Sequence, residues 1–495
     1  MPNSGLFAAI DLGASSARLF AGRMEGDRLQ VREVTRMKNG PVQLPDGIHW
    51  DLLGIYRQML ESLGKLSREA DDGELSVGID SWGVDYGLLD ADGRLLGPPF
   101  HYRDDRTDGR LEQLDRLIGL GEVYQATGIQ DMAINTICQL LAERESAGFG
   151  AASRLLMVPD LFAYMLSGQA RLERTIASTT QLVDARTGQL VDWLLARLGV
   201  RRDLFAPPIE PGEQYGPVLP AVAASVGMAR PAIVAAVGCH DTASAVLAAP
   251  LENEGTAWVS SGTWSLVGLE LDAPVISPAS RQANFSNELG FGRSVRFLKN
   301  VMGHWMVQEC ERCWALEGND VRLVDLLAQA EACPPFRSLV DTEDPVFAVP
   351  GDMPARIRQA CDRGGEPVPE TEAELVRCIL DSMALAICAV LEQAEACAGK
   401  RIRGLHVVGG GSANYLLLSL LASASGLPVA AGPTEASAVG NLLAQLHARG
   451  MVGDQAEMRQ VVARSFPIVR VSPDPDLAKA AGSAKARLAD LAGAR

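Results

Sequence analysis

The chain lacks a long apolar run and any targeting signal at its start. No stretch reaches the roughly 18 apolar residues that a membrane-spanning helix needs, and the stretch that comes nearest, 220–238, is interrupted by Arg230 and Pro231. The first residues carry neither a basic flank nor an apolar segment of the kind found in signal peptides. We therefore expect a cytoplasmic protein without a membrane partner.

Positive charge is in deficit, with 45 Lys and Arg against 61 Asp and Glu and a formal net charge of −16. Bulk electrostatics then oppose binding to nucleic acid, so we expect no nucleic-acid partner. A phosphate site in such a chain has to use backbone N–H groups and local cations instead of overall charge.

Cysteine is sparse, with nine residues scattered through 495. An odd number without an export signal predicts free thiols in a reducing compartment. Cys310 and Cys313 form a C-x-x-C, but a zinc site would need a second pair and a redox site a different context. We interpret these two as ordinary buried cysteines.

Two familiar nucleotide motifs are also missing. Residues 409–414, Gly-Gly-Gly-Ser-Ala-Asn, lack the third spaced glycine of the dinucleotide fingerprint, and no Walker lysine motif occurs. The triplet Gly409-Gly410-Gly411 nevertheless lies between a predicted strand and a predicted helix. Glycines there permit close backbone approach to a nucleotide, and a helix N-terminus favours phosphate.

What the chain does contain is a repeated hairpin. A length of 495 residues favours two large domains. An apolar strand over 7–13 runs into a small-residue turn and a second strand over 14–21, and the same pattern recurs over 256–268. We predict two lobes built on one plan, 1–248 and 249–495, which meet at the turn-rich stretch 248–254.

Each hairpin turn consists of Gly, Ala, Ser and Thr, which leave backbone N–H groups open to an anion. Asp11 ends the first strand, and a carboxylate beside phosphates requires a cation such as Mg²⁺ between them. This indicates a metal–triphosphate site. The alternative is that Gly13 and Gly262 only serve tight turns.

Asp241 follows an apolar strand predicted over 233–237 and stands at the start of a small-residue helix, between His240 and Thr242. An aspartate there is often a helix N-cap. A kinase needs a carboxylate that accepts the proton of the substrate hydroxyl, and Asp241 has the position for that role. Both interpretations stay open at this point.

A further polar cluster comprises residues 80–85, Asp-Ser-Trp-Gly-Val-Asp, and 102–106, Tyr-Arg-Asp-Asp-Arg. Sugar sites combine hydrogen-bonding side chains with an apolar wall, which Trp82 could supply while Gly83 leaves clearance. Arg103 and Arg106 have an equally good alternative, namely ion pairs with their neighbours Asp104 and Asp105.

Periodicity predicts the remaining elements. Helices are expected over 52–66, 300–316, 375–397, 415–425 and 436–450, with a surface helix after residue 476. Strands are expected over 28–36, 75–80, 84–89, 405–408 and 428–431.

Taken in order, the motifs resemble those of the FGGY carbohydrate kinases, and within them most closely the rhamnulokinases. The matching segments are 11–16, 78–85, 102–107, 240–246, 260–266, 298–303 and 408–411. The resemblance implies an α/β fold of the two-lobed, actin-like (ribonuclease H-like) kind, with duplicated mixed-sheet domains around a central cleft. It also implies ATP and Mg²⁺ as cofactors and a small ketose as substrate, in a monomer or homodimer.

The resemblance also assigns roles, residue by residue. Asp241 would be the proton acceptor and Asp11 the metal-proximal aspartate. The residues implied along ATP are Ala14, Ser15, Ser16, Ala17, Arg18, Thr263, Gln308 and Gly410. Those implied around the sugar are Gly83, His240, Asp241, Thr242 and Asn300.

Two positions depart from the family pattern. Ala17 stands where Gly is expected, which narrows the backbone angles open to the first hairpin. Leu289 stands where a second Gly is usual, in a loop on the sugar side. The implied substrate is L-rhamnulose, phosphorylated at O1, while L-fuculose, L-ribulose and L-xylulose stay open. An actin-like ATPase without a sugar substrate is the alternative from another class.

Overall fold

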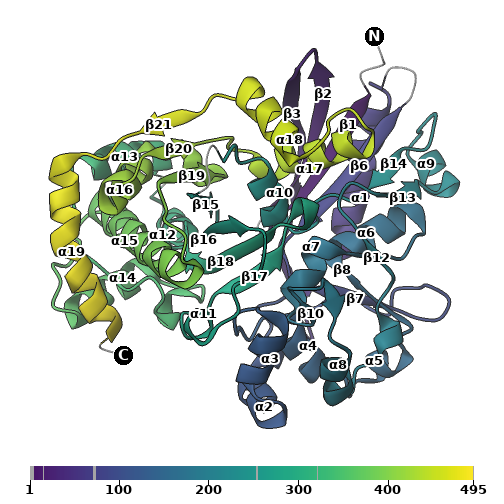
Figure 1. The fold of residues 1–495 in the computed structure, drawn as a ribbon, viewed down its shortest axis with the longest axis horizontal. Helices are drawn as coiled ribbons and strands as arrows, with labels where there is room; N and C mark the ends of the chain where they lie inside the picture. Colours follow the sequence, from purple (N-terminus) through teal and green to yellow (C-terminus); the bar gives the residue numbers. More distant parts are fainter. Residues whose placement is uncertain (1–4, 15, 71–73, 252–254, 320, 494–495) are drawn as a thin grey trace. The chain divides into compact units, whose positions relative to one another are not determined.

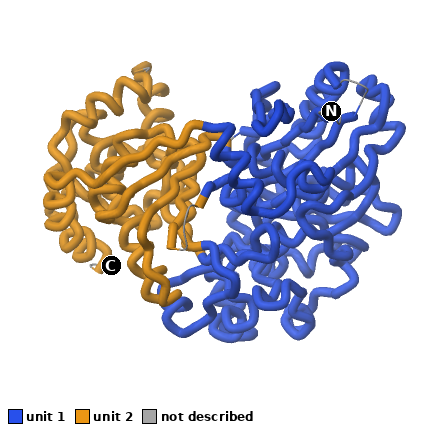
Figure 2. The backbone as a smooth tube through the Cα atoms, turned by 45° about the horizontal axis from the view of Figure 1, so that its top comes forward, with its two compact units in different colours: residues 1–250, 270–297, 436–466 blue, residues 251–269, 298–435, 467–495 orange. Residues whose placement is uncertain are grey.

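The computed structural model describes residues 5–14, 16–70, 74–251, 255–319 and 321–493. They divide into two compact units, shown in two colours in Figure 2. The first contains residues 1–250, 270–297 and 436–466, and the second contains 251–269, 298–435 and 467–495. The chain thus enters the second unit close to residue 248, and two later segments return to the first. A division of the whole chain into 1–248 and 249–495 stays a prediction.

The first unit is built on a six-stranded mixed sheet with the order β13-β14-β6-β1-β2-β3. Its strands are β1 (Leu6–Leu12), β2 (Ser16–Glu25), β3 (Arg28–Lys38), β6 (Leu75–Ser81), β13 (Gln214–Pro217) and β14 (Ile233–Ala235). Strands β1, β6 and β14 run parallel to one another, β2 and β13 flank them antiparallel, and β3 pairs antiparallel with β2. Every residue of β1 and β6 is buried, which explains their near-continuous apolar sequence.

Helices from both ends of the chain cover this sheet. Helix α1 (Leu52–Ser67) buries its apolar stripe against β1, β2 and β3, and the Asp51 side chain caps its first turn by accepting from Gly54 N. Helices α17 (Ala436–Ala448) and α18 (Gln455–Ser465) come from much later in the sequence. Figure 1 shows these yellow helices beside the purple strands; α17 contacts β1 and β6, and α18 contacts β3.

Smaller elements complete the first unit. Its short strands are β4 (Pro41–Leu44), β5 (Gly47–Trp50), β7 (Tyr86–Leu89), β8 (Arg154–Met157), β9 (Leu172–Glu173), β10 (Val183–Asp184), β11 (Gln189–Leu190), β12 (Pro208–Ile209) and β17 (Ser286–Leu289). Its other helices are α2 (Arg110–Leu117), α3 (Leu120–Thr127), α4 (Thr136–Glu143), α5 (Ala147–Ala151), α6 (Val158–Ser167), α7 (Arg174–Ala177), α8 (Asp192–Leu198), α9 (Pro220–Ser225), α10 (Asp241–Leu247) and α11 (Pro278–Gln282).

The second sheet repeats the plan of the first. Its order is β17-β18-β16-β15-β19-β20-β21, with β15 (Thr256–Ser261), β16 (Trp264–Leu271), β18 (Val295–Met302), β19 (Gly404–Val408), β20 (Val429–Ala431) and β21 (Val469–Val471). The hairpin β15–β16 corresponds to β1–β2, and the parallel neighbours β19 and β20 correspond to β6 and β14. The antiparallel edge strand β21 corresponds to β13. The prediction of two hairpins on one plan is confirmed at the level of strand order.

The helices of the second unit are α12 (Trp305–Leu316), α13 (Leu323–Glu331), α14 (Met353–Arg363), α15 (Glu372–Ala398), α16 (Tyr415–Ser425) and α19 (Pro475–Gly493). Cys310 and Cys313 are buried in α12, which confirms their interpretation as core residues. Among the residues described, no helix is both long and apolar enough to cross a membrane.

The helix predicted over 300–316 begins too early. Residues 300–302 continue strand β18, and α12 starts only at Trp305. Gly303 lies between them, and a Cβ there would come within 2.7 Å of Thr263 O. The chain passes so close to the β15–β16 turn that it changes direction at this glycine, which periodicity alone does not reveal.

Candidate functional site

Three parallel strands of the first unit end at one edge of the sheet and bring acidic residues together there. Asp11 on β1 is the register partner of Asp80 on β6. Beyond it, Ser81 pairs with His240, which immediately precedes Asp241. In open α/β sheets, ligands bind outside the carboxyl ends of the strands, so this edge is the candidate site of the first unit.

The first hairpin turn is tight and well anchored. Gly13 N donates to Ser16 O at 3.1 Å, and Asn39 Nδ2 donates to Gly13 O at 2.7 Å. A Cβ on Gly13 would come within 2.8 Å of Ser16 O, so this turn requires glycine. Ser15 and its predicted contact with ATP lie outside the described residues. The predicted metal residue Asp11 is 5% exposed and forms an ion pair with Arg18 at 2.7 Å.

The substitution of Ala for Gly at position 17 causes no strain. Ala17 pairs with Leu12 inside the β1–β2 ladder, is fully buried and is not in the left-handed region of backbone angles. Its methyl group therefore belongs to the core. Ala14, Ser16 and Arg18 are each partly exposed in or beside the turn.

Asp80 is a buried carboxylate of which only one oxygen has a hydrogen-bond partner among the described residues. Its Oδ2 accepts from Asn441 Nδ2 at 2.6 Å, while its Oδ1 has no hydrogen-bond partner in the described part of the chain. Burial, together with the neighbouring Asp11, raises the pKa of Asp80 well above its ordinary value. Two oxygen-bearing acids in one place fit a hard dication, which typically takes one or two carboxylates and fills its shell with water and phosphate. Across the described ranges, no group of three or more His, Cys, Asp or Glu residues forms a cage for a metal.

Asp241 is not a helix cap. It is the first residue of α10, and the capping position belongs to His240, whose side chain makes no capping hydrogen bond. Its Oδ1 accepts from Thr242 Oγ1 at 3.0 Å and lies 3.5 Å from His240 Nε2. About a third of the Asp241 side chain is exposed, whereas His240 is buried. The carboxylate can therefore reach a ligand.

Hydrogen bonds between main-chain N–H groups and the side chains of Glu173 and Thr175 hold the segment before Asp241 in place. The carboxylate of Glu173 accepts from Cys239 N and from both the backbone N–H and the hydroxyl of Thr175. Thr175 Oγ1 in turn accepts from His240 N at 3.2 Å. Burial raises the pKa of Glu173 to about 7. Glu173, which caps the start of α7, therefore fixes the backbone that carries the predicted base Asp241.

A buried ionic group lies behind His240. Glu288 Oε2 is 3.0 Å from His240 Nδ1 and 3.0 Å from Arg296 Nη2. Arg296 is completely buried, and Glu288 is 6% exposed. Burial opposes ionisation of Glu288, but His240 and Arg296 outweigh it and lower the pKa of the carboxyl below its ordinary value. Burial lowers the pKa of Arg296.

The segment around Gly83 packs against Thr179. Val84 N donates to Thr179 Oγ1 at 3.1 Å, and a Cβ on Gly83 would lie 3.1 Å from that same oxygen. The absence of a side chain at Gly83 thus allows close packing against Thr179, while the contact of Gly83 with a sugar stays a prediction. Trp82 does not form the wall of a sugar site that was expected, because it is only 6% exposed and stacks on Trp50 with ring centroids 3.9 Å apart. Trp82 belongs to the interior.

Asp85 organises these aromatic rings. Its carboxylate accepts from the indole N–H groups of Trp50 and Trp82, at 2.7 and 3.0 Å, and from Tyr102 N and Gln139 Nε2. Complete burial raises the pKa of Asp85 to about 6 despite these four donors.

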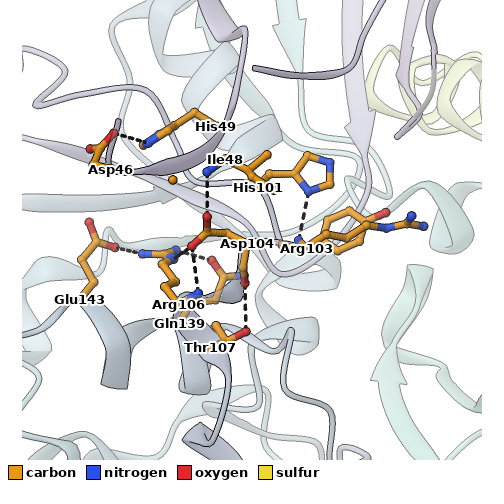
Figure 3. Close-up of polar contacts among 12 residues, drawn as sticks. Asp46, Ile48, His49, His101, Arg103, Asp104, Arg106, Thr107, Gln139 and Glu143 are labelled. Carbon is orange, nitrogen blue, oxygen red and sulfur yellow. Dashed lines mark hydrogen bonds and ion pairs between the residues drawn. The ribbon is translucent and has the colours of Figure 1, made fainter. Parts of the chain in front are cut away.

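The two arginines of segment 102–106 behave differently. Arg106 donates to Glu143 Oε2 and Gln139 Oε1, at 3.0 and 2.8 Å (Figure 3). Its guanidinium also lies over the ring of Phe100. Asp104 accepts from the backbone of Ile48 and of Arg106. The ion-pair interpretation is therefore correct for Arg106, although Glu143 is the closest acid. Arg103 points away from this group in Figure 3. Its guanidinium lies 5.6 Å from the ring centroid of Tyr102.

In the second unit, the β15–β16 turn rests on the start of α12. Gly262 O accepts from His304 N, and Thr263 O accepts from Trp305 N, both at 3.1 Å. This arrangement places the Thr263 hydroxyl 3.5 Å from Gln308 Oε1. The structure thus brings together two residues that the sequence predicts along ATP. Asn300, predicted on the sugar side, is a partly exposed residue of strand β18 in this unit.

The three glycines after β19 have different surroundings. A Cβ on Gly409 would lie 2.9 Å from Ser261 O, and one on Gly411 would lie 2.3 Å from Ser261 Oγ. Gly409 also has a φ of +81°. These two glycines are required by the packing against β15. Gly410 is exposed, and nothing lies within 4 Å of the place of its Cβ, so it alone faces open space.

Comparison with known proteins decides the family. Residues 6–248 match the N-terminal domain, and residues 257–449 the C-terminal domain, of the FGGY family of carbohydrate kinases. The chain belongs to this family. The FGGY kinase described here is 41% identical to a rhamnulokinase of Bacteroides thetaiotaomicron over 94% of its own length and 96% of that protein. It is 38% identical to a rhamnulokinase of Bacillus subtilis over 94% and 95%.

Solved structures confirm the predicted fold class. A xylulose kinase of Lactobacillus acidophilus superposes with a TM-score of 0.81 at 14% identity, covering 99% of this FGGY kinase and 98% of that chain. A glycerol kinase of Plasmodium falciparum, solved with ADP, gives 0.77 at 13% identity, covering 98% and 97%. The two-lobed actin-like α/β fold is thereby confirmed.

In the first unit of this FGGY kinase, sequence reasoning assigned no role to Glu288 or Arg296, and it placed Asp80 in a polar cluster without pairing it with Asp11. Asp80, Glu288 and Arg296 lie in strands β6, β17 and β18 at 0%, 6% and 0% exposure. Charged residues are almost never fully buried unless they are paired. For Asp80 the signal was a charge at the end of the strand predicted over 75–80, whereas no strand was predicted around Glu288 or Arg296 and no comparable signal marked them.

Proposed function

We propose that this FGGY kinase transfers the γ-phosphoryl group of ATP to O1 of L-rhamnulose. The observation that carries the proposal is about 40% identity to curated rhamnulokinases along 94% of the chain. An aspartate at the carboxyl edge of the first sheet, partly exposed and free of a capping role, supports it further.

Asp241 is the proposed base. Its carboxylate accepts the proton of the O1 hydroxyl while that oxygen forms a bond to the γ-phosphorus of ATP. The bond from this phosphorus to the bridging oxygen breaks, and ADP leaves with the electron pair. The products are L-rhamnulose 1-phosphate, ADP and the proton. Thr242, which donates to Asp241 Oδ1, keeps this carboxylate oriented. Gly83, His240, Thr242 and Asn300 are the proposed contacts of the sugar.

ATP is the proposed donor, with Mg²⁺ held by Asp11 at the end of β1. Bound Mg²⁺ would neutralise charge on the phosphate oxygens. The turn residues 14–18 offer backbone N–H groups to the phosphates. In the second unit, Thr263 is assigned to the transferring phosphoryl group, and Gln308 and Gly410 to the nucleotide. A cytoplasmic location and a monomeric or homodimeric state complete the proposal, and sedimentation analysis tests the latter.

A ketose panel tests the substrate. ADP release, coupled to NADH oxidation, is measured with L-rhamnulose, L-fuculose, L-ribulose and L-xylulose over a range of concentrations. The proposal expects the highest kcat/KM for L-rhamnulose. A higher kcat/KM for another ketose overturns the substrate but keeps the kinase. ATP turnover that no sugar stimulates, or polymerisation with ATP, would instead indicate an actin-like ATPase.

A further inference from the structure

The first unit contains a cavity that the proposed function does not use. Its volume is about 610 Å³, which is within the usual range for small-molecule sites. All of its lining residues belong to segments 172–210 and 272–295 of this unit. None of them is among the residues proposed to contact ATP, metal or sugar, so a ligand here would occupy a separate site.

The wall of this cavity has more basic than acidic side chains. It contains four arginines and two acids, namely Arg174, Arg186, Arg202, Arg293, Glu210 and Asp272. Arg186 Nη1 lies 3.4 Å from Asp184 Oδ1, and Arg202 Nε donates to Asp192 Oδ1 at 3.1 Å. Those two aspartates do not line the cavity, and they already compensate their arginines. The other two arginines therefore distinguish this wall.

Arg174 has hydrogen-bond donors that the protein does not use. Its side chain is only 12% exposed, and Nη1 donates to Glu210 Oε1 at a long 3.4 Å. Its Nε is buried and has no hydrogen-bond partner in the part of the chain that the structure describes. Leaving a buried donor without an acceptor costs free energy. An acceptor that enters the cavity would account for this arrangement.

The guanidinium of Arg174 is held in a fixed place. A Cβ on Gly188, in the turn between β10 and β11, would lie 3.3 Å from Arg174 Cζ, so only a glycine lets this turn lie so close. Glu173 and Thr175, the two sequence neighbours of Arg174, are hydrogen-bonded to each other and to the segment before Asp241. Because the group is fixed before a ligand arrives, binding costs less conformational entropy.

Arg293 is a second cation at the wall, and it is exposed. No hydrogen bond or ion pair joins its side chain to any other described residue. Its φ is +70°, in the left-handed region that residues other than glycine seldom adopt. Such conformations persist only where the surrounding structure imposes them, and they are concentrated at ligand sites. The fold thus keeps an uncompensated guanidinium beside the cavity.

We propose that this cavity binds the phosphate group of a small molecule, with Arg174 and Arg293 as its cations. A guanidinium donates in a fixed fork that matches two phosphate oxygens. A phosphate monoester carries a charge of about −1.5 to −2 at pH 7, which two arginines can compensate. The wall also contains the buried apolar residues Leu172, Val183 and Val295, which leave room beside the phosphate for the body of a ligand such as a sugar.

Calorimetric titration tests the chemistry of the ligand. The protein is first saturated with Mg²⁺ and a non-hydrolysable ATP analogue, which fills the proposed nucleotide site. The probes are glucose 6-phosphate, glucuronate, glucose and inorganic phosphate. We expect glucose 6-phosphate to bind with a Kd at least about 10-fold below that of glucuronate, and glucose to give no measurable binding. Inorganic phosphate binding as tightly as glucose 6-phosphate would support the site with free phosphate as its source. Glucuronate binding as tightly would overturn the preference for phosphate.

Variants test the location. R293N removes one cation without new strain, since asparagine enters the left-handed region more readily than arginine. R174Q removes the other, and its melting temperature checks the fold. R94N is the control, because Arg94 is an exposed arginine of the same unit outside the cavity. We expect the Kd for glucose 6-phosphate to rise at least about 10-fold in R293N and R174Q and to stay unchanged in R94N.

A wild-type Kd in R293N, or no binding of either phosphate compound to wild type, would overturn the proposal. R293N decides the matter even if R174Q does not fold, because Arg293 is exposed. These binding constants do not depend on turnover. Failure of the wild type to phosphorylate any ketose would contradict the proposed function and leave the cavity as a phosphate site.

Discussion

Asp11 and Asp80 stand directly opposite each other on the adjacent parallel strands β1 and β6, and both are buried. Two carboxylates in this position repel one another, and burial strengthens the repulsion. Arg18 pairs with Asp11, and Asn441 donates to Asp80. We therefore expect the charge of this pair of acids to be compensated best when a dication is bound.

Removing the Asp80 charge should stabilise the protein without metal. In D80N the amide oxygen can still accept from Asn441, and the new NH₂ group takes the place of Oδ1, which has no hydrogen-bond partner among the described residues. We expect a melting temperature about 2–4 °C above wild type in EDTA at neutral pH, equivalent to roughly 1 kcal/mol. Added Mg²⁺ and ATP should raise the melting temperature of wild type more than that of D80N. Lower stability of D80N in EDTA would contradict this account of the pair.

Replacing the proposed base should abolish most turnover and leave the fold intact. D241N keeps the size of the side chain and its contact with Thr242, but an amide cannot accept the proton. We expect kcat to fall at least about 100-fold, the usual contribution of a general base. Coupled ADP release measures kcat, and calorimetric titration with ATP serves as the control for nucleotide binding. A kcat near the wild-type value would remove Asp241 from this role.

Gly410 and Gly411 form a matched pair that separates nucleotide contact from packing. A methyl group at 411 would meet Ser261 Oγ at 2.3 Å, so we expect G411A to lose about 1–3 kcal/mol of unfolding free energy. A methyl group at 410 meets nothing within 4 Å. G410A should therefore keep the wild-type melting temperature and raise the KM for ATP several-fold. An unchanged KM in G410A would argue against Gly410 as a nucleotide contact.

The raised pKa of Asp85 predicts how the free energy of unfolding depends on pH. Its pKa is about 6 in the folded protein and 3.8 ordinarily, so the folded state holds the proton more tightly than the unfolded state. The stability that this group contributes is fully present below about pH 4 and is lost as the pH rises through 6. The loss is on the order of 3 kcal/mol.

The comparison with D85N isolates this contribution. The unfolding free energy of wild type minus that of D85N, from urea titrations between pH 4.5 and 7.5, should decrease as the pH rises. The exposed Asp92 provides a control for the same change of side chain at the surface, and D92N is measured over the same pH range. A wild-type advantage that grows with pH would show that Asp85 is ionised more readily in the folded protein than its burial indicates.

Local patterns predicted much of the fold and several site residues. The two hairpins, the turn glycine Gly13 and the strand leading to Asp241 each depend on a few consecutive residues, whose backbone preferences are visible in the sequence. Polar contacts between distant segments are different. Asn441 donates to Asp80 although 361 residues separate them in the sequence. Glu288 on β17 lies 3.0 Å from His240, which precedes α10. Nothing in the local sequence of either partner identifies the other.

The same reasoning explains the two errors of detail. Trp82 was expected to form a wall because an exposed and a buried tryptophan look alike in sequence; its burial depends on Trp50 and Asp85. The start of α12 was misplaced because residues 300–302 suit either a strand or a helix, and only the approach of Gly303 to the second hairpin decides between them.

Helix α17 has a consequence for how the protein is made. It covers Gly22 through Leu442 and Gly78 through Asn441, yet a ribosome delivers it 361 residues after Asp80. At 5–20 residues per second, the growing chain waits roughly 20–70 s with that side of β1 and β6 uncovered. Synthesis of the first unit starts first, but its last segment, 436–466, is made only after most of the second unit. We therefore expect a nascent chain that ends before about residue 448 to leave this side of the first sheet exposed, and α17 to cover it.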